Sequence, residues 1–151
     1  MRAIDLLRQQ HREIIRILEG LRAADVDEAA DLLPRLAGTL RAHVAVEEDV
    51  FYLEIEEDED LEEAVADSFR QHEEIRDALA ELESCSPADP DFSHLVDELE
   101  EVFGHHAEED ERELLAKIQE SWPEDALEEL GERMEQRGEE LGVSEGVDRS
   151  T

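Results

Sequence analysis

The chain has 151 residues, a length that suits one domain with one hydrophobic core. Its 46 acidic residues against 14 basic ones give a formal net charge of -32, which argues against nucleic acid and against anionic membranes as partners. A surface this acidic repels itself in dilute salt and is typical of halophilic proteins from salt-accumulating cells.

Apolar residues recur at steps of three and four along four segments, which predicts four amphipathic helices. These helices are expected at about residues 3–22, 27–57, 61–83 and 92–120. Pro34 lies near the first turns of the second segment, so we expect that helix to begin irregularly. Short connections join antiparallel neighbours, and the predicted fold class is therefore all-α, an up-down-up-down four-helix bundle.

The bundle is predicted to occupy residues 1–120, and residues 121–151 are expected to form a short fifth helix and a flexible C-terminal tail. Ser121, followed three residues later by Glu124, is typical of a capping box, with Pro123 early in the first turn. Gly138 is the expected end of this helix.

Cellular location is indicated by what the sequence lacks. The first helix carries charges throughout its apolar stretch, which is not typical of a signal peptide. No apolar run approaches the length of a membrane span. Cys85 is the only cysteine, so no intrachain disulfide can form. We therefore expect a soluble, cytoplasmic protein that does not bind membranes.

Polar residues interrupt each apolar stripe near the middle of its helix. They are His11, His43, Glu47, His72, His106 and Asp110. Because the midpoints of antiparallel helices lie at similar heights, these side chains are expected to converge inside the bundle. Burial of unpaired carboxylates would be very costly, and no Lys or Arg lies on the stripes at this height. Imidazole with carboxylate suits iron, manganese or zinc, so the pattern predicts a metal cluster.

Other polar residues have simpler interpretations. A lone histidine is usually a hydrogen-bonded core or interface residue, and His94 is assigned to that class. Four acids lie off the stripes and are predicted to be solvated: Glu48, Glu108, Glu109 and Glu111. His105 points about 100° away from His106 around the helix. A competing register pairs His105 with Asp110, but the step of four residues favours His106.

Four blocks of sequence resemble the hemerythrin-like, HHE cation-binding domain family over about residues 1–120. They are RQQHREII (8–15), HVAVEEDVFY (43–52), QHEEIRDAL (71–79) and HHAEEDERELL (105–115). The resemblance implies a four-helix bundle that holds two iron ions joined by an oxo or hydroxo bridge. Carried over by position, the ligands would be His11, His43, Glu47, His72, His106 and Asp110, with Glu47 and Asp110 bridging.

The sequence departs from the family pattern in the third helix. Arg76 stands where oxygen-carrying relatives have a second histidine, four residues after His72. One iron would therefore carry water at an open position, or His105 would be an extra ligand. Leu53 and Ala116 stand where many relatives have proline, a change that affects helix ends rather than ligands.

The resemblance implies a protein that binds or senses dioxygen, or a related small ligand such as nitric oxide. Because a fold and its ligands do not fix an activity, other functions stay open. One is a di-iron enzyme of oxidative or nitrosative stress defence, of the peroxidase or repair type. Another is iron storage or a zinc-bound structural bundle.

Overall fold

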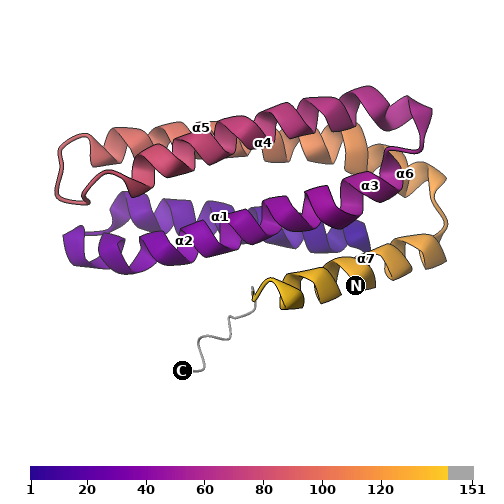
Figure 1. Cartoon of the computed structure of the whole chain (residues 1–151), viewed down its shortest axis with the longest axis horizontal. Helices are drawn as coiled ribbons and strands as arrows, with labels where there is room; N and C mark the ends of the chain where they lie inside the picture. Colours follow the sequence, from indigo (N-terminus) through magenta and orange to yellow (C-terminus); the bar gives the residue numbers. More distant parts are fainter. Residues whose placement is uncertain (143–151) are drawn as a thin grey trace.

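The computed structural model describes residues 1–142, which form an antiparallel four-helix bundle with a further helix packed against its side near one end (Figure 1). The first and third bundle helices are α1 (Ala3–Ala23) and α4 (Glu62–Glu83). Within residues 1–142, no strand is present, and no helix is apolar enough over a sufficient length to cross a bilayer. The predicted all-α bundle is confirmed.

The second and fourth bundle helices each contain a π-helical segment. The second consists of α2 (Val26–Val46), the π-helix η1 (Glu47–Phe51) and α3 (Tyr52–Ile55). The short 3-10 helix η2 (Glu59–Leu61) then leads into α4. The fourth consists of α5 (Phe92–Glu109), the π-helix η3 (Asp110–Leu115) and α6 (Ala116–Ser121). Both π-helices lie inside otherwise continuous helices.

The start of α2 differs from the irregular one predicted from Pro34. The Asp25 side chain accepts from the Glu28 N–H while the Glu28 side chain accepts from the Asp25 N–H, which completes a capping box. Pro34 is exposed, and so is Ala30, whose carbonyl loses its helical partner at that proline. The helix nevertheless continues through Pro34 without a break.

The apolar core is divided into two clusters along the bundle axis. One cluster lies in the half of the bundle against which the last helix packs and includes Leu7, Phe51 and Leu115. The other fills the opposite half and includes Leu18, Leu40 and Phe103. The polar residues singled out above lie between them.

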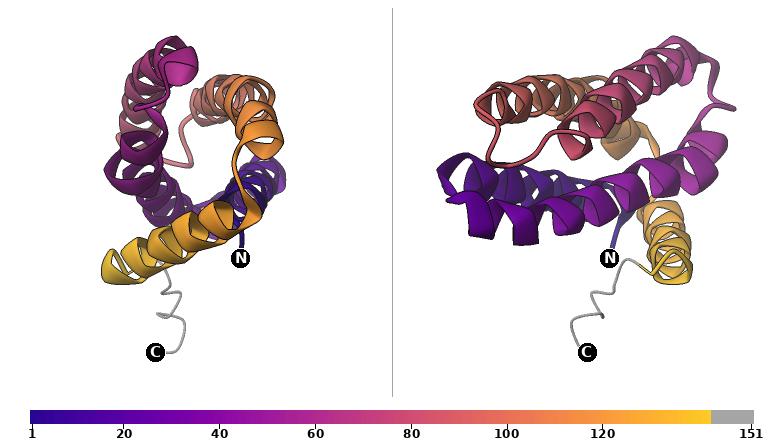
Figure 2. Two further views of the ribbon diagram at one scale, coloured as in Figure 1. Left: turned by 90° about the vertical axis from the view of Figure 1, so that its right-hand side faces the viewer. Right: turned by 60° about the vertical axis from the view of Figure 1, so that its left-hand side comes forward.

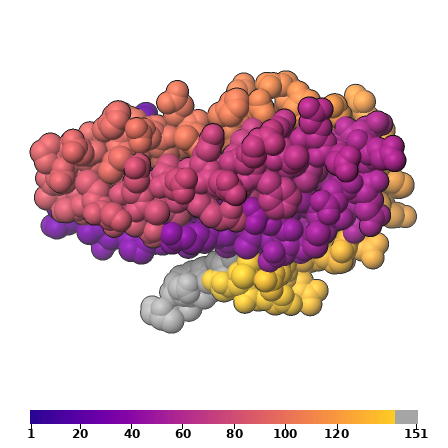
Figure 3. Space-filling view, turned by 45° about the horizontal axis from the view of Figure 1, so that its top comes forward, coloured from indigo at the N-terminus to yellow at the C-terminus, as the bar shows by residue number. Residues whose placement is uncertain are grey.

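The last helix, α7 (Glu124–Glu140), crosses the outer side of the bundle near one end and contacts α1, α2 and η1 (Figures 2 and 3). Gly131 allows the closest approach, because a Cβ atom there would lie 1.9 Å from the Met1 carbonyl oxygen. Arg133 pairs with Glu54 at 2.8 Å and Arg137 with Asp49 at 3.0 Å. These contacts tie α7 to the second bundle helix beside its π-helix.

Two details of the predicted C-terminal region are wrong. Ser121 does not cap α7, since it ends α6 and its Oγ donates to the Lys117 carbonyl; α7 begins after Pro123 without a side-chain cap. The helix also continues past Gly138, and the left-handed glycine beyond its end is Gly142, with φ of 77°. The predicted flexible tail falls largely on residues 143–151, outside the described part of the chain.

Candidate metal centre

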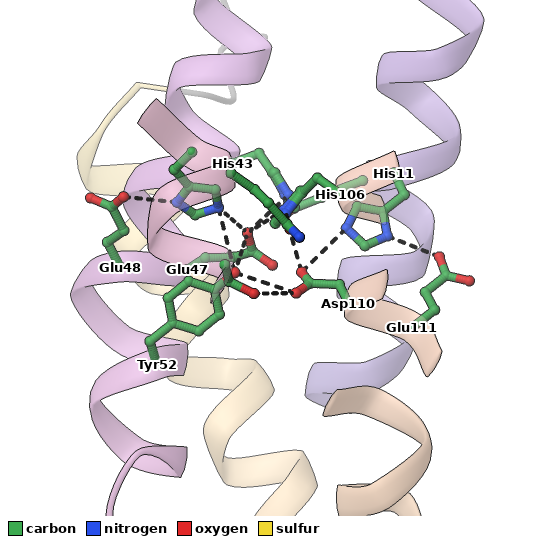
Figure 4. Close-up of polar contacts among 12 residues, drawn as sticks. His11, His43, Glu47, Glu48, Tyr52, His106, Asp110 and Glu111 are labelled. Atoms are coloured by element: carbon green, nitrogen blue, oxygen red, sulfur yellow. Dashed lines mark hydrogen bonds and ion pairs between the residues drawn. The ribbon is translucent and has the colours of Figure 1, made fainter. Parts of the chain in front are cut away.

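Six polar side chains meet in the layer between the two apolar clusters (Figure 4). Each has an exposed fraction of 2% or less, and all four bundle helices contribute. They are the six residues that the stripes predicted to converge: His11, His43, Glu47, His72, His106 and Asp110. These side chains therefore lie together at one level of the bundle, as the midpoints of antiparallel helices predicted.

Each π-helix begins at one of the two carboxylates. The N–H of Tyr52 donates to the carbonyl of Glu47, five residues back, where an α-helix would use four. In the fourth bundle helix, Asp110 opens the π-helix and the N–H of Ala116 donates to the carbonyl of Glu111. Because the wider turn accommodates one extra residue, Tyr52 lies on the same face as Glu47.

The inward nitrogen atoms surround the two carboxylates. The Glu47 Oε1 atom lies 2.9 Å from His72 Nε2 and 3.3 Å from both His43 Nε2 and His106 Nε2. The Asp110 Oδ2 atom lies 3.4 Å from His106 Nε2 and 3.9 Å from His11 Nε2. These distances place all six donors in one connected group.

Four of the donors satisfy the spacing for a single ion. Ligand atoms of His11, His43, Glu47 and His106 all lie within 4.8 Å of one another. His72 and Asp110 lie beside this group, each within reach of Glu47 or His106. These two residues are therefore adjacent to the four-donor group.

Every imidazole is held from outside the cluster by a hydrogen bond at Nδ1. The partners belong to neighbouring helices and fix both the tautomer and the orientation of each ring. The bonds are His11 to Glu111 at 2.9 Å, His43 to Gln10 at 2.7 Å, His72 to Glu48 at 2.8 Å and His106 to Gln71 at 2.8 Å. All four Nε2 atoms are consequently turned inward.

Two of these partners correct the sequence interpretation. Glu48 and Glu111 were predicted to be solvated surface residues, yet each accepts from a cluster histidine, and the Glu48 side chain is only 20% exposed. Glu109 also departs from that prediction, because it accepts from the Gln71 amide at 2.9 Å. Glu108 is exposed, as predicted.

Two histidines lie away from the cluster. The His105 side chain is 59% exposed and its Nε2 atom lies 3.6 Å from Glu109, so it lies outside the cluster. The His94 side chain is 73% exposed and pairs with Glu98, so it is a surface residue rather than a core or interface one. Arg76, at the position of the missing histidine, donates to Glu48 at 2.7 Å.

Two hydroxyl groups that sequence reasoning missed contact the carboxylates. The Tyr52 hydroxyl donates to Glu47 Oε1 at 3.1 Å, and the Ser68 hydroxyl donates to Asp110 Oδ1 at 3.0 Å. Tyr52 is fully buried and Ser68 is 4% exposed. Neither residue was singled out from the sequence, and nothing in the α-helical spacing indicated Tyr52.

The electrostatics of the layer are those of charges buried close together. Burial and then the charge of Glu47 raise the pKa of Asp110 well above its usual value. Burial also favours a raised pKa for Glu47, but the charge of His43 and hydrogen bonds from three histidines outweigh it and hold that pKa well below normal. Burial lowers the pKa of His43 to about 4. A cation would relieve this conflict between neighbouring carboxylates.

The residues present fit a bound metal. Four buried atoms have no hydrogen-bond partner among the described residues: His11 Nε2, His43 Nε2, Glu47 Oε2 and Asp110 Oδ2. Buried polar atoms are rarely left unpaired, because each costs free energy comparable to a lost hydrogen bond. Divalent cations coordinated by imidazole and carboxylate would satisfy all four.

Comparisons with known proteins agree with the fold and the site. A model of the hemerythrin HHE cation-binding domain matches residues 2–118. None of the curated proteins is similar enough to match. A solved structure of a hemerythrin HHE cation-binding domain-containing protein from Mycobacterium kansasii aligns with a TM-score of 0.85 and 24% identity, over 95% of this chain and 89% of that one. The chain therefore belongs to the hemerythrin HHE cation-binding domain family.

Proposed function

We propose that this chain is a non-haem di-iron protein that binds or senses dioxygen, or a related small ligand such as nitric oxide. The observation that carries the proposal is the set of four inward Nε2 atoms around two buried carboxylates, each imidazole fixed at Nδ1. A single ion needs only four of these six donors. The two remaining donors, His72 and Asp110, support a second ion.

The proposed ligand sets divide along the cluster. One ion would be held by His11, His43 and His106 together with Glu47. The other would be held by His72, with Glu47 and Asp110 shared between the two. Ferrous ions at these positions would supply electrons and open positions to a diatomic ligand.

The surrounding side chains would exclude water from the bound ligand. The Phe103 ring lies 5.9 Å from His11, 6.0 Å from His43 and 6.1 Å from His106, centroid to centroid, and is fully buried. It packs against the three histidines of the first group of donors. Exclusion of water strengthens every electrostatic interaction in such a site.

An enzyme of peroxide removal or nitrosative repair is the second candidate, and a surface pocket favours it. The pocket holds about 220 Å³, and Ser68 at its wall donates to Asp110, so a polar molecule there would be one hydrogen bond from the cluster. The pocket is lined by Asp60, Glu63, Ala64, Asp67, Ser68, Glu109, Glu113, Leu114 and Lys117. Such a route would let a small polar substrate approach and its product leave.

The test begins with metal content and continues with the ligand. Protein made in iron-replete cells should contain about two iron atoms per chain, as paired-metal sites require. After anaerobic reduction, dioxygen should produce a stable change in visible absorption that reverses when the gas is removed. Bleaching with continuous peroxide consumption would favour the enzyme instead. One zinc and no iron per chain would contradict both.

A further inference from the structure

We infer that Arg76 is a positioning residue that acts through Glu48 on His72 and thereby raises the reduction potential of the second iron ion. The inference rests on the proposed paired-metal site and concerns a residue that is not itself a ligand. It is carried by a chain of contacts from Arg76 to the cluster and by the absence of such a chain at the other three histidines.

The Glu48 carboxylate joins two residues that stand one turn apart on α4. Its Oε2 atom accepts from His72 Nδ1 at 2.8 Å, and its Oε1 atom accepts from the Arg76 guanidinium at 2.7 Å. On the opposite side of the imidazole, His72 Nε2 lies 2.9 Å from Glu47 Oε1. Arg76, Glu48 and the His72 ring therefore form one chain of contacts that ends at the donors of the second ion.

Both oxygen atoms of Glu48 are used in this chain, which leaves the carboxylate little freedom. Glu48 follows Glu47 in the π-helix η1 and lies on the outer side of the cluster (Figure 4). Within residues 1–142, Glu48 is the only acid whose carboxylate lies within 4 Å of the Arg76 guanidinium. A half-exposed ion pair adds little to stability, but this one fixes the direction in which the carboxylate faces His72.

The other three histidines of the cluster lack an arginine behind their Nδ1 partners. Neutral amide oxygens hold His43 and His106. The Glu111 carboxylate holds His11, but no Lys or Arg nitrogen in the described part of the chain lies within 4 Å of Glu111. Of the four imidazoles, His72 is thus the one connected to a guanidinium through its partner.

The charge of Arg76 opposes the effect of Glu48 on the imidazole. A carboxylate at Nδ1 raises the donor strength of a metal-bound histidine, which stabilises the more highly charged ion. A guanidinium on the far oxygen draws charge from that carboxylate and weakens the effect. The positive charge of Arg76 also disfavours Fe³⁺ directly. Because both contributions have the same sign, Arg76 favours Fe²⁺ over Fe³⁺ at the second position.

The first experiment is a redox titration of the full chain with two irons bound, followed by visible absorption. Arg76→Gln should raise the preference of one iron for the ferric state about tenfold, which lowers its potential by about 59 mV. Arg76→Lys keeps the positive charge and should restore most of this shift. Arg70→Gln is the matched control, since it removes the same charge from α4, where Arg70 is exposed and pairs with Asp67.

The second measurement locates the effect within the cluster. In protein loaded with zinc, which is diamagnetic, proton NMR can observe the Nδ1–H groups of His72 and His11. The His72 signal should move downfield in Arg76→Gln, because a less neutralised carboxylate accepts a stronger hydrogen bond. The His11 signal should stay in place, since Glu111 has no such arginine.

The outcomes separate the role of Arg76 from the paired-metal site. Two irons per chain with the same potentials in wild type and Arg76→Gln would overturn the inference and leave the site intact. Equal shifts in Arg76→Gln and Arg70→Gln would also overturn it, because the overall charge would then be the cause. A potential shift without any movement of the His72 signal would show that Glu48 does not transmit it. Failure to bind two metal ions would contradict the proposed function, and this inference with it.

Discussion

His105 and His106 are neighbours in sequence but lie in opposite environments. His106 is buried, with Nδ1 on Gln71 and Nε2 facing Glu47 and Asp110, whereas His105 is largely exposed. His106→Ala should therefore lose most of the bound iron, while His105→Ala keeps about two irons per chain. Elemental analysis of the two variants side by side is the measurement. Retention of iron by His106→Ala would show that the proposed ligand set is wrong.

His43 links the cluster to pH. Its pKa of about 4 in the folded, metal-free protein lies below the value of about 6.5 in an unfolded chain. Between these two pH values the unfolded chain binds a proton at His43 that the folded chain does not bind. The contribution of His43 to stability is therefore complete above about pH 6.5. It is lost as pH falls toward 4, with an upper limit of about 3 kcal/mol.

The wild-type protein without metal should therefore lose more stability than His43→Asn between about pH 6.5 and 4.5. The comparison cancels the protonation of the acidic surface, which both proteins share. Denaturant unfolding curves at several pH values would measure the difference. Parallel curves for the two proteins would contradict the pKa shift as its source.

Residues that reach the cluster from outside the stripes were beyond sequence reasoning. Glu48 and Glu111 each stand one residue after a cluster carboxylate, in a chain with 46 acidic residues, so nothing in the sequence separated them from solvated surface. Gln10 and Gln71 each stand one residue before a cluster histidine but bond to a histidine of another helix. Such pairings depend on how helices are packed, which spacing along one helix does not reveal.

At the scale of helices, the periodic pattern of apolar residues predicted the bundle but did not predict its π-helices. Steps of three and four predicted the four bundle helices and the six converging side chains. An α-helical step puts Tyr52 well away from Glu47, and only the extra residue of η1 brings the two together. A wider turn of this kind has no reliable sequence signal, which is why Tyr52 was missed.

The packing of helix α7 can be tested at the scale of helices. Gly131→Ala would place a methyl group on the Met1 carbonyl, so α7 must shift, and the free energy of unfolding should fall by about 1–3 kcal/mol. Gly38→Ala is the control, since it lies in α2 with nothing within 4 Å of the added atom. It should raise stability by about 0.5–1 kcal/mol through helix propensity alone. Equal effects of the two substitutions would contradict the close packing of α7.

At the scale of the whole molecule, the net charge of -32 should make stability depend on salt. Screening shortens the range of repulsion to about 3 Å at 1 M salt. The melting temperature should therefore rise clearly between about 0.1 and 3 M KCl, as measured by circular dichroism. A flat profile would show that the acidic surface does not limit the stability of the fold.

The polar layer between the two apolar clusters has a consequence for how the bundle comes apart. Without metal, a layer of buried imidazole and carboxyl groups separates the halves, so each half should open with its own free energy. Ions bound by donors from all four bundle helices would join the halves into one cooperative unit. Hydrogen exchange should then show two levels of backbone protection in metal-free protein and one in loaded protein. The cooperativity of unfolding would thus be conferred by the ions rather than by the chain alone.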